Sequence, residues 1–450
     1  MTAGARSRVT ILAKSTAVSV TPVRPGKTYP LSILDRSMGR HTVRLVFYYR
    51  SGTWLDPVKL KESFSEVLSY YPAMTGRMTR QGEEEGGGWL VKCNDAGVRM
   101  LEARADATLD EWLRSASDEE ELELAYWEPM GQDPFLWSPF YVQLTEFKDK
   151  SYAIGLSCTH MHADPTCAIL FLHAWADIHR RLAIVFPPFF HPPAFLPRPS
   201  PNPVSPLLSL KSITTSSVTT AAAVSSATFL FSSAAVRRLI ADCSASSASP
   251  FDALASLFWL RIARASYVKG GATAQYLTLA VDFRKRLQAP LPFGFFGNTL
   301  LLSRARANLE AGWGSVADEV ARHVEGMQEE DLWSAVEWLH AHSSSGGGEP
   351  FRMYGPELTC LKLDHVPVKS VEFEPGVGPE HVACRVGDVE GEGLIVVMAA
   401  PASAEKGEGE GDASLARMVV LTLPTELTAE LCDDDVILQY GPTIAFPPKA

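Results

Sequence analysis

The chain has 450 residues, of which 46% are hydrophobic and 21% are charged, a composition typical of a globular protein rather than a disordered one. Its 41 lysines and arginines against 52 aspartates and glutamates give a net charge of −11, and the absence of a basic block argues against binding to nucleic acid or anionic lipid. No apolar run of about 18 residues predicts a membrane span, and the N-terminus lacks the pattern of a signal peptide. Seven cysteines without a CxxC pair suit a reducing compartment, so we expect a cytoplasmic protein.

The first half of the chain alternates strand-like and helix-like segments. Residues 43–50 and 151–158 are rich in β-branched and aromatic residues and predict strands. Between them, residues 56–71 predict a helix, because Asp56 is a suitable N-cap, Pro57 is a suitable first helical residue, and apolar side chains recur along one face. This alternation predicts the α/β fold class.

A change of composition divides the chain near its middle. Residues 183–206 contain nine prolines, which rule out regular structure, and residues 209–227 are rich in Ser, Thr and Ala. We therefore expect a crossover linker at 185–226 between an N-terminal lobe, 1–184, and a C-terminal lobe of similar size, 227–450. In the second lobe, ATFLFSS and QYLTLAVDF predict strands and SPFDALASLFWLRIARA predicts an amphipathic helix.

The most informative segment, CTHMHADP at 158–165, lies between a predicted strand and a predicted helix. Three interpretations of it are open. His160 can act as a general base, since a neutral imidazole accepts a proton near pH 7. His160, His162 and Asp164 also match the first part of a zinc ligand set, which would indicate a zinc hydrolase. Finally, Asp164 can serve only as the N-cap of the helix that begins at Pro165, with both histidines in a polar loop.

The His-x-x-x-Asp pattern alone is not specific, because a chain with eleven histidines is expected to match it about once by chance. A second match, His173 and Asp177, falls inside the predicted helix. There the i,i+4 spacing predicts a contact on one helix face. Only the sequence around each match, and not the pattern itself, can show which of the two matches is functional.

A second segment of the sequence favours the match at His160 over the match at His173. Residues 281–298 read VDFRKRLQAPLPFGFFGN, which resembles the D-x-R-x-R-x-x-P-P-L-P-x-x-Y-F-G-N segment of the plant BAHD acyltransferases. The stretches TYPLSILDRSMGRH, YYPAMTGRM and SPFDALASLFWLRIARA are similar as well, so the resemblance covers nearly the whole chain. It implies two chloramphenicol-acetyltransferase-like lobes with a solvent channel at their interface. It also implies a monomer with no bound cofactor or metal, which uses acyl-CoA as co-substrate and a small-molecule acceptor.

The resemblance also assigns roles to residues. His160 would be the general base that deprotonates an acceptor hydroxyl or amine for attack on the acyl-CoA thioester. Asp164 would point away from the reaction and pair with Arg284, which fixes the loop that holds His160. Asn298 ends the matching segment and would support the site. Thr359 lies where many members carry Thr-Ser-Trp, side chains thought to help the tetrahedral oxyanion.

Two departures from the family pattern bear on turnover. The family's D-F-G-W-G signature corresponds to residues 371–378, where Phe373 and Gly376 remain, Glu372 replaces the aspartate, and the tryptophan is absent. The tryptophan of Thr-Ser-Trp is absent too. Loss of one oxyanion donor costs about 10²–10³ in rate. The fold favours an acyl-CoA-dependent O- or N-acyltransferase, whereas the degenerate 372–376 segment argues against full turnover.

The stretches LDRSMGRHTVRLVFYYRS, VKCNDAGVRMLEA and YGPELTCLKLD are similar to the Eceriferum/Glossy-type proteins of cuticular wax synthesis. That resemblance implies action on very-long-chain acyl-CoAs with the condensing enzyme of the fatty acid elongase, and a peripheral location at the endoplasmic reticulum through that partner. Two functions stay open: acyl transfer at His160, and a non-catalytic accessory role beside the condensing enzyme. The zinc hydrolase that would use His160, His162 and Asp164 is a third alternative.

Overall fold

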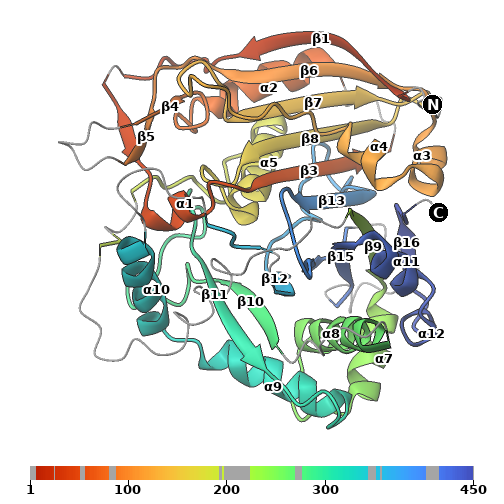
Figure 1. Cartoon of the computed structure of the whole chain (residues 1–450). Coiled ribbons are helices and arrows are strands. Elements are labelled where there is room, and N and C mark those ends of the chain that lie inside the picture. The colour runs from red at the N-terminus through yellow and green to blue at the C-terminus, as the bar shows by residue number, and fades with distance from the viewer. Residues whose placement is uncertain are drawn as a thin grey trace.

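The computed structural model of the chain describes residues 7–24, 26–50, 56–80, 88–191, 195–196, 223–268, 276–342, 351–354, 357–401 and 415–448. The predicted linker at 185–226 therefore lies largely outside the described residues. Within them, the chain forms a six-stranded, a seven-stranded and a three-stranded sheet (Figure 1). None of the described helices is long and apolar enough to cross a membrane.

The six-stranded sheet belongs mostly to the first half of the chain, in the order β1-β6-β7-β8-β3-β13. Its strands are β1 (Val9–Ala17), β3 (Thr42–Tyr49), β6 (Val98–Ala105), β7 (Phe140–Glu146), β8 (Tyr152–Thr159) and β13 (His381–Val386). The last of these comes from the second half and pairs antiparallel with β3, from His381 opposite Tyr48 to Val386 opposite Val43. Figure 1 shows this strand in blue beside the red β3. The second half of the chain thus completes the sheet of the first.

The seven-stranded sheet has the order β11-β10-β12-β14-β15-β9-β16 and comes entirely from the second half. Its strands are β9 (Val224–Phe231), β10 (Tyr276–Asp282), β11 (Leu300–Arg306), β12 (Thr359–Leu363), β14 (Leu394–Ala399), β15 (Arg417–Pro424) and β16 (Thr443–Ala445). The third sheet joins β2 (Thr28–Pro30), β5 (Trp89–Lys92) and β4 (Arg77–Arg80). Both large sheets are mixed, since β6 and β7 run parallel in one, and β10, β12 and β14 run parallel in the other.

The helices lie around these sheets (Figure 1). They are α1 (Ile33–Ser37), α2 (Pro57–Leu68), α3 (Leu109–Ser115), α4 (Asp118–Leu122), α5 (Pro165–His179), α7 (Ser233–Cys243), α8 (Pro250–Val268), α9 (Trp313–Gly326), α10 (Glu329–His342), α11 (Thr425–Cys432) and α12 (Asp435–Leu438). The helix α5 packs against both α2 and β3. It is mostly apolar and is buried from its first residue to Asp177, as expected for a helix enclosed between layers.

The predicted local elements of the first half are present. The strands expected at 43–50 and 151–158 are β3 and β8, and the helix expected at 56–71 is α2. Asp56 caps this helix, because its carboxylate accepts a hydrogen bond of 2.9 Å from the backbone N–H of Val58. The helix ends three residues earlier than predicted. Its last turn tightens, since the N–H groups of residues 69 and 70 bond carbonyls only three residues back.

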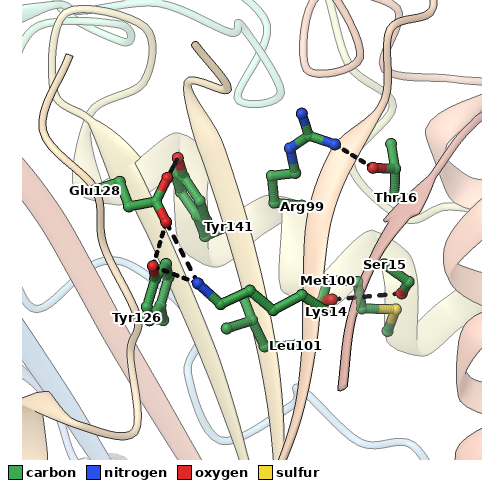
Figure 2. Close-up of a pocket in the computed structure, with 9 residues that line it drawn as sticks. All are labelled: Lys14, Ser15, Thr16, Arg99, Met100, Leu101, Tyr126, Glu128 and Tyr141. Carbon is green, nitrogen blue, oxygen red and sulfur yellow. Dashed lines mark hydrogen bonds and ion pairs between the residues drawn. The ribbon is translucent and has the colours of Figure 1, made fainter. Parts of the chain in front are cut away.

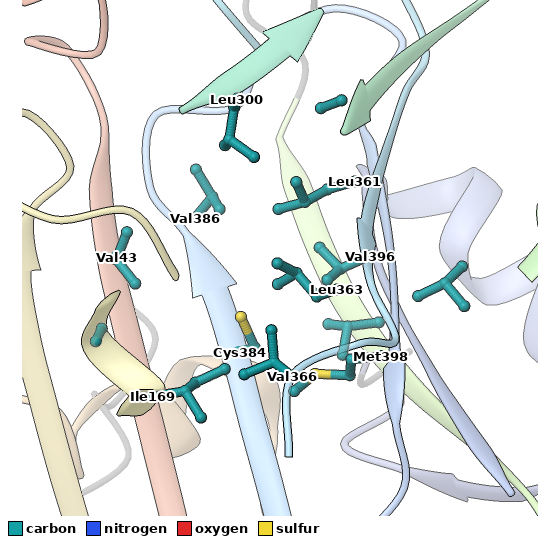
Figure 3. Packing of buried hydrophobic residues seen from close by; sticks show 14 of the residues in the cluster. Val43, Ile169, Leu300, Leu361, Leu363, Val366, Cys384, Val386, Val396 and Met398 are labelled. Atoms are coloured by element: carbon teal, nitrogen blue, oxygen red, sulfur yellow. The ribbon is translucent and has the colours of Figure 1, made fainter. Parts of the chain in front are cut away.

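The hydrophobic core is continuous between the two halves (Figure 3). In one cluster, Val43 of β3 and Ile169 of α5 belong with Val386 of β13, Leu361 of β12 and Val396 of β14, and all five are buried. Burial of apolar surface contributes about 25 cal/mol per Å². The shared core, together with β13, therefore holds the two large sheets in a fixed relation, and segments from both halves meet at their junction.

Candidate active site

The turn that carries His160 is fixed by backbone hydrogen bonds at the end of β8. The N–H of His160 donates to the carbonyl of His41 at 2.9 Å, and the N–H of His162 donates to the carbonyl of Thr159 at 3.0 Å. Asp164 then caps α5, accepting a hydrogen bond of 2.9 Å from the backbone N–H of Cys167. Pro165 begins the helix, as its missing N–H and fixed φ favour.

Asp164 is held by an arginine from the second half of the chain. Arg284 Nη2 donates to both carboxylate oxygens of Asp164, at 3.0 and 2.8 Å, and both side chains are completely buried. Arg284 also pairs with Asp282 and donates to the carbonyl of Gly297, each at 2.8 Å. Burial lowers the pKa of Arg284, but the charges of Asp164 and Asp282 raise it by more, so the pKa lies well above its ordinary value. The guanidinium is therefore a permanent charge that fixes the start of α5.

Asn298 fixes the other side of the turn. Its Nδ2 donates to the carbonyl of His160 and to Asp35 Oδ1, both at 2.9 Å, and its backbone N–H donates to the same carboxylate oxygen at 2.8 Å. Asp35 lies in α1, where a capping box with Ser32 orients it. Asp35 was not singled out from the sequence, although the S-x-x-D spacing of this box is visible there.

The imidazole of His160 is completely buried. Its Nε2 lies 3.0 Å from the hydroxyl of Tyr354, which is completely buried as well. Burial lowers the pKa of His160, and the opposing charge of Asp164 does not reverse this. Burial also raises the pKa of Tyr354 well above its ordinary value. Both groups are neutral at pH 7, and in either tautomer of the imidazole the Nε2 atom is engaged by this phenol.

His41 anchors the segment that presents Tyr354. Its Nε2 accepts a hydrogen bond of 3.2 Å from the backbone N–H of Met353, and its Nδ1 lies 3.1 Å from the carbonyl of Gly387. Because an N–H can only donate and a carbonyl can only accept, the His41 proton resides on Nδ1. Burial lowers the pKa of His41 to about 3, so the ring stays neutral. The edge of the Tyr354 ring meets the His41 ring at a centroid distance of 5.0 Å.

His162 does not join His160. It packs edge-on against Phe140, with ring centroids 4.9 Å apart, and lines a cavity of about 30 Å³ with Asp35. Neither of its ring nitrogens has a hydrogen-bond partner among the described residues, and burial lowers its pKa to about 3. The zinc interpretation needs His160, His162 and Asp164 to converge, whereas each of them faces different neighbours. In the described part of the chain, no group of three or more metal-ligating side chains is placed to hold an ion.

Thr359 lies at the start of β12, between β10 and β14. Its hydroxyl donates to the carbonyl of Glu357 at 3.1 Å and its N–H donates to Gly393 at 3.0 Å. Among the described residues, neither of these hydrogen bonds joins Thr359 to His160. The part of Thr359 in binding an oxyanion therefore rests on the sequence resemblance.

The degenerate segment 371–378 contacts α5 near its C-terminal end, far from the turn that carries His160. Phe373 packs edge-on against Trp175, with ring centroids 5.1 Å apart. A helical rise of about 1.5 Å per residue places Trp175 about 15 Å along α5 from its first residue. Phe373, one of the two residues that remain from this signature, thus supports the far end of the helix that Asp164 caps.

A cavity of about 240 Å³ lies elsewhere, against β1, β6 and β7 (Figure 2). Lys14 Nζ donates hydrogen bonds to the hydroxyl of Tyr126 at 2.6 Å and to the carboxylate of Glu128 at 3.4 Å. Arg99 donates a hydrogen bond to the hydroxyl of Thr16. Lys14 and Glu128 therefore pair with each other, and Arg99 is bonded to a hydroxyl. None of the site residues expected from the sequence lines it.

Comparison with known proteins agrees with this fold and with the sequence resemblance. The crystal structure of vinorine synthase superposes with a TM-score of 0.70 at 19% identity, covering 94% of this chain and 96% of that one, which is a likeness of fold. The model of the Transferase family matches residues 7–426, and the chain belongs to this family, that of the BAHD acyltransferases. Members of the family use acyl-CoA as their co-substrate.

Two relatives cover nearly the full length of the chain. A hydroxycinnamoyltransferase from Narcissus pseudonarcissus is 28% identical over 435 residues, which is 88% of this chain and 94% of that protein. Protein ECERIFERUM 26 from Arabidopsis thaliana is 26% identical over 424 residues, 92% of each chain. The chain is thus similar both to a named transferase and to an Eceriferum protein.

Proposed function

We propose that this protein handles the acyl group of an acyl-CoA, with His160 as the general base of acyl transfer to a hydroxyl or amine. The observation that carries the proposal is the buried ion pair between Asp164 and Arg284, which joins residues 120 positions apart. Such a pair fixes the turn that presents His160 at the junction of the two sheets. A general base needs its imidazole held in position more than it needs a charged neighbour.

The proposed reaction uses one proton acceptor and several positioning residues. His160 Nε2 takes the proton of the acceptor, whose oxygen or nitrogen attacks the thioester carbonyl carbon. The C–S bond breaks, and the departing thiolate of CoA takes the proton back from His160. Asp164 and Arg284 position the turn from one side and Asn298 positions it from the other. We assign the support of the oxyanion to Thr359 on the sequence resemblance alone.

The proposed setting is very-long-chain fatty acid elongation and cuticular wax synthesis. The resemblance to Eceriferum/Glossy-type proteins supports it, as does the full-length similarity to ECERIFERUM 26. In this setting the protein acts as a monomer with an N-terminal lobe at 1–184, a linker at 185–226 and a C-terminal lobe at 227–450. It is cytoplasmic, and reaches the surface of the endoplasmic reticulum through the condensing enzyme of the elongase.

A second candidate function is a non-catalytic accessory of that condensing enzyme. One observation favours it. The Nε2 atom that has to accept a proton is completely buried and lies 3.0 Å from the Tyr354 hydroxyl. An accessory protein would keep the fold and the Asp164–Arg284 pair for stability and would have no need of a free base.

The experiment that tests the proposal uses yeast carrying a plant elongase condensing enzyme. We would add the wild type, His160→Ala or His173→Ala and profile the acyl chain lengths. His173 belongs to the second His-x-x-x-Asp pattern and lies outside the proposed site, so it is the matched control. We expect longer chains with the wild type and with His173→Ala but not with His160→Ala. Equal elongation by all three forms would contradict a base role of His160 and support the accessory function.

A further inference from the structure

Tyr354 stands where an acceptor would have to bind. A general base takes a proton from a group about 2.6–3.2 Å away. The Tyr354 hydroxyl occupies this position, at 3.0 Å from His160 Nε2. The side chain of Tyr354 is a phenol, so it presents to the base the same chemical group that a phenolic acceptor would present. In the wild type an external hydroxyl therefore reaches Nε2 only by displacing this one.

The position of the Tyr354 ring is fixed by its surroundings. Its backbone neighbour Met353 is bonded to His41, whose proton location is set by the carbonyl of Gly387. The Tyr354 ring meets the His41 ring at 5.0 Å and the His160 ring at 5.7 Å, and no part of the Tyr354 side chain is exposed. Three separate contacts therefore hold the phenol in place. A side chain held in this way competes with every incoming acceptor.

We propose that Tyr354 determines the acceptor specificity of this protein: its phenol fills the acceptor position on His160, and shortening the side chain creates a binding site for a phenolic acceptor. This inference rests on the proposed function, in which His160 is the base. Tyr354 forms the acceptor site and takes no part in the reaction. The wild type accordingly excludes phenols from His160.

The chemistry at the opened site balances without any additional reactant. The proton of a bound phenol passes to His160 Nε2, and its oxygen forms a bond to the thioester carbonyl carbon of an acyl-CoA. The C–S bond breaks, and the thiolate of CoA takes the proton from His160. The products are a phenyl ester and free CoA.

The test uses Tyr354→Ala, which removes a phenol from the chain, with added phenol as the ligand that replaces it. A space left by a ring can bind a small aromatic molecule. We expect phenol to raise the melting temperature of Tyr354→Ala and not that of the wild type or of Tyr354→Phe, whose ring still fills the site. With acetyl-, hexadecanoyl- and caffeoyl-CoA as donors, we expect Tyr354→Ala to form a phenyl ester, detected by mass spectrometry. Its rate should exceed that of Tyr354→Ala/His160→Ala by about 100-fold or more, the contribution of a general base.

A matched control is Tyr49→Ala. Tyr49 is also completely buried, and its hydroxyl donates to the carbonyl of Val371 at 2.9 Å. Tyr49 lies at the other end of β3 from the His160 turn, so phenol can bind in the space it leaves but no ester should form there through His160. Should Tyr354→Ala be recovered unfolded, Tyr354→Leu with ethanol as acceptor carries the test, and we expect more ethyl ester than with the wild type.

The outcomes separate this inference from the proposed function. A folded Tyr354→Ala that binds phenol no better than the wild type would overturn the inference. Equal ester formation by the wild type would overturn it too. If phenol binds Tyr354→Ala and shifts the NMR signals of the His160 ring, but no ester forms, the acceptor position stands and the base role of His160 fails.

Discussion

Two His-x-x-x-Asp patterns, thirteen residues apart, have opposite structures. His173 and Asp177 lie in one helix and contact each other at 3.2 Å, which confirms the predicted helix-face contact. His160 and Asp164 straddle the start of that helix, and no hydrogen bond joins them in the described structure. Asp164 bonds to Arg284 instead, and the His160 ring faces Tyr354.

The difference shows what the spacing means in each setting. Within a helix, residues four apart lie on one face and satisfy each other. Across a turn and a helix start, the two side chains diverge and are free to contact distant parts of the chain. Both members of the first pattern contact the second half of the chain, His160 through Tyr354 and Asp164 through Arg284. In the second pattern Asp177 is satisfied locally, and His173 Nε2 lies 3.2 Å from the hydroxyl of Ser370.

The largest effect expected from this comparison concerns the two arginines that pair with the aspartates of the patterns, Arg284 with Asp164 and Arg180 with Asp177. Arg284→Met leaves the buried carboxylate of Asp164 without its cation, so we expect a loss of about 3–5 kcal/mol in the free energy of unfolding. Arg180 donates to Asp177 at 3.2 Å and is partly exposed, and Arg180→Met should cost less than half as much. Urea unfolding of both variants measures the difference. Equal losses would show that the two patterns are energetically alike.

A smaller effect concerns the charge state of the turn. Burial lowers the pKa of His162 in the folded chain to about 3, below the ordinary value of 6.5. Between these pH values the unfolded chain binds a proton at His162 that the folded chain does not bind. Its contribution to stability is therefore present above pH 6.5 and is lost as the pH falls toward 3. We expect His162→Leu to reduce the stability lost between about pH 7 and about pH 5 by roughly 2 kcal/mol. Chemical unfolding at the two pH values checks this, and an unchanged pH dependence would contradict it.

A comparison of the two helix caps, in which the control variant has the smallest expected effect, separates the two tasks of Asp164. Asp56 precedes a proline and caps α2 as Asp164 caps α5, but no ion pair of Asp56 occurs among the described residues. Asp56→Ala should therefore cost only the cap, about 1 kcal/mol. Asp164→Ala should cost more, because the same change also removes one of the two carboxylates that pair with the buried Arg284. If the two variants lost the same stability in urea, the ion pair would contribute nothing beyond the cap.

The sequence by itself determined the local structure and the family. Asp-Pro pairs marked the starts of α2 and α5, and β-branched and aromatic residues marked β3 and β8, because these signals act over one turn or one strand. The segment 281–298 identified the family, since its spaced positions are far more specific than His-x-x-x-Asp. The same segment contains Arg284 and Asn298, which the fold brings to the His160 turn.

Only the tertiary structure decided how distant segments meet. Nothing in residues 381–386 indicates that β13 joins the sheet of the first half, because strand pairing depends on partners more than 300 positions away. The contacts of Asp35 with Asn298 and of His41 with Met353 are of the same kind. So is the contact of Tyr354 with His160, 194 positions apart. The sequence supplies a candidate base, but the packing of a buried phenol against it decides whether an acceptor can reach that base.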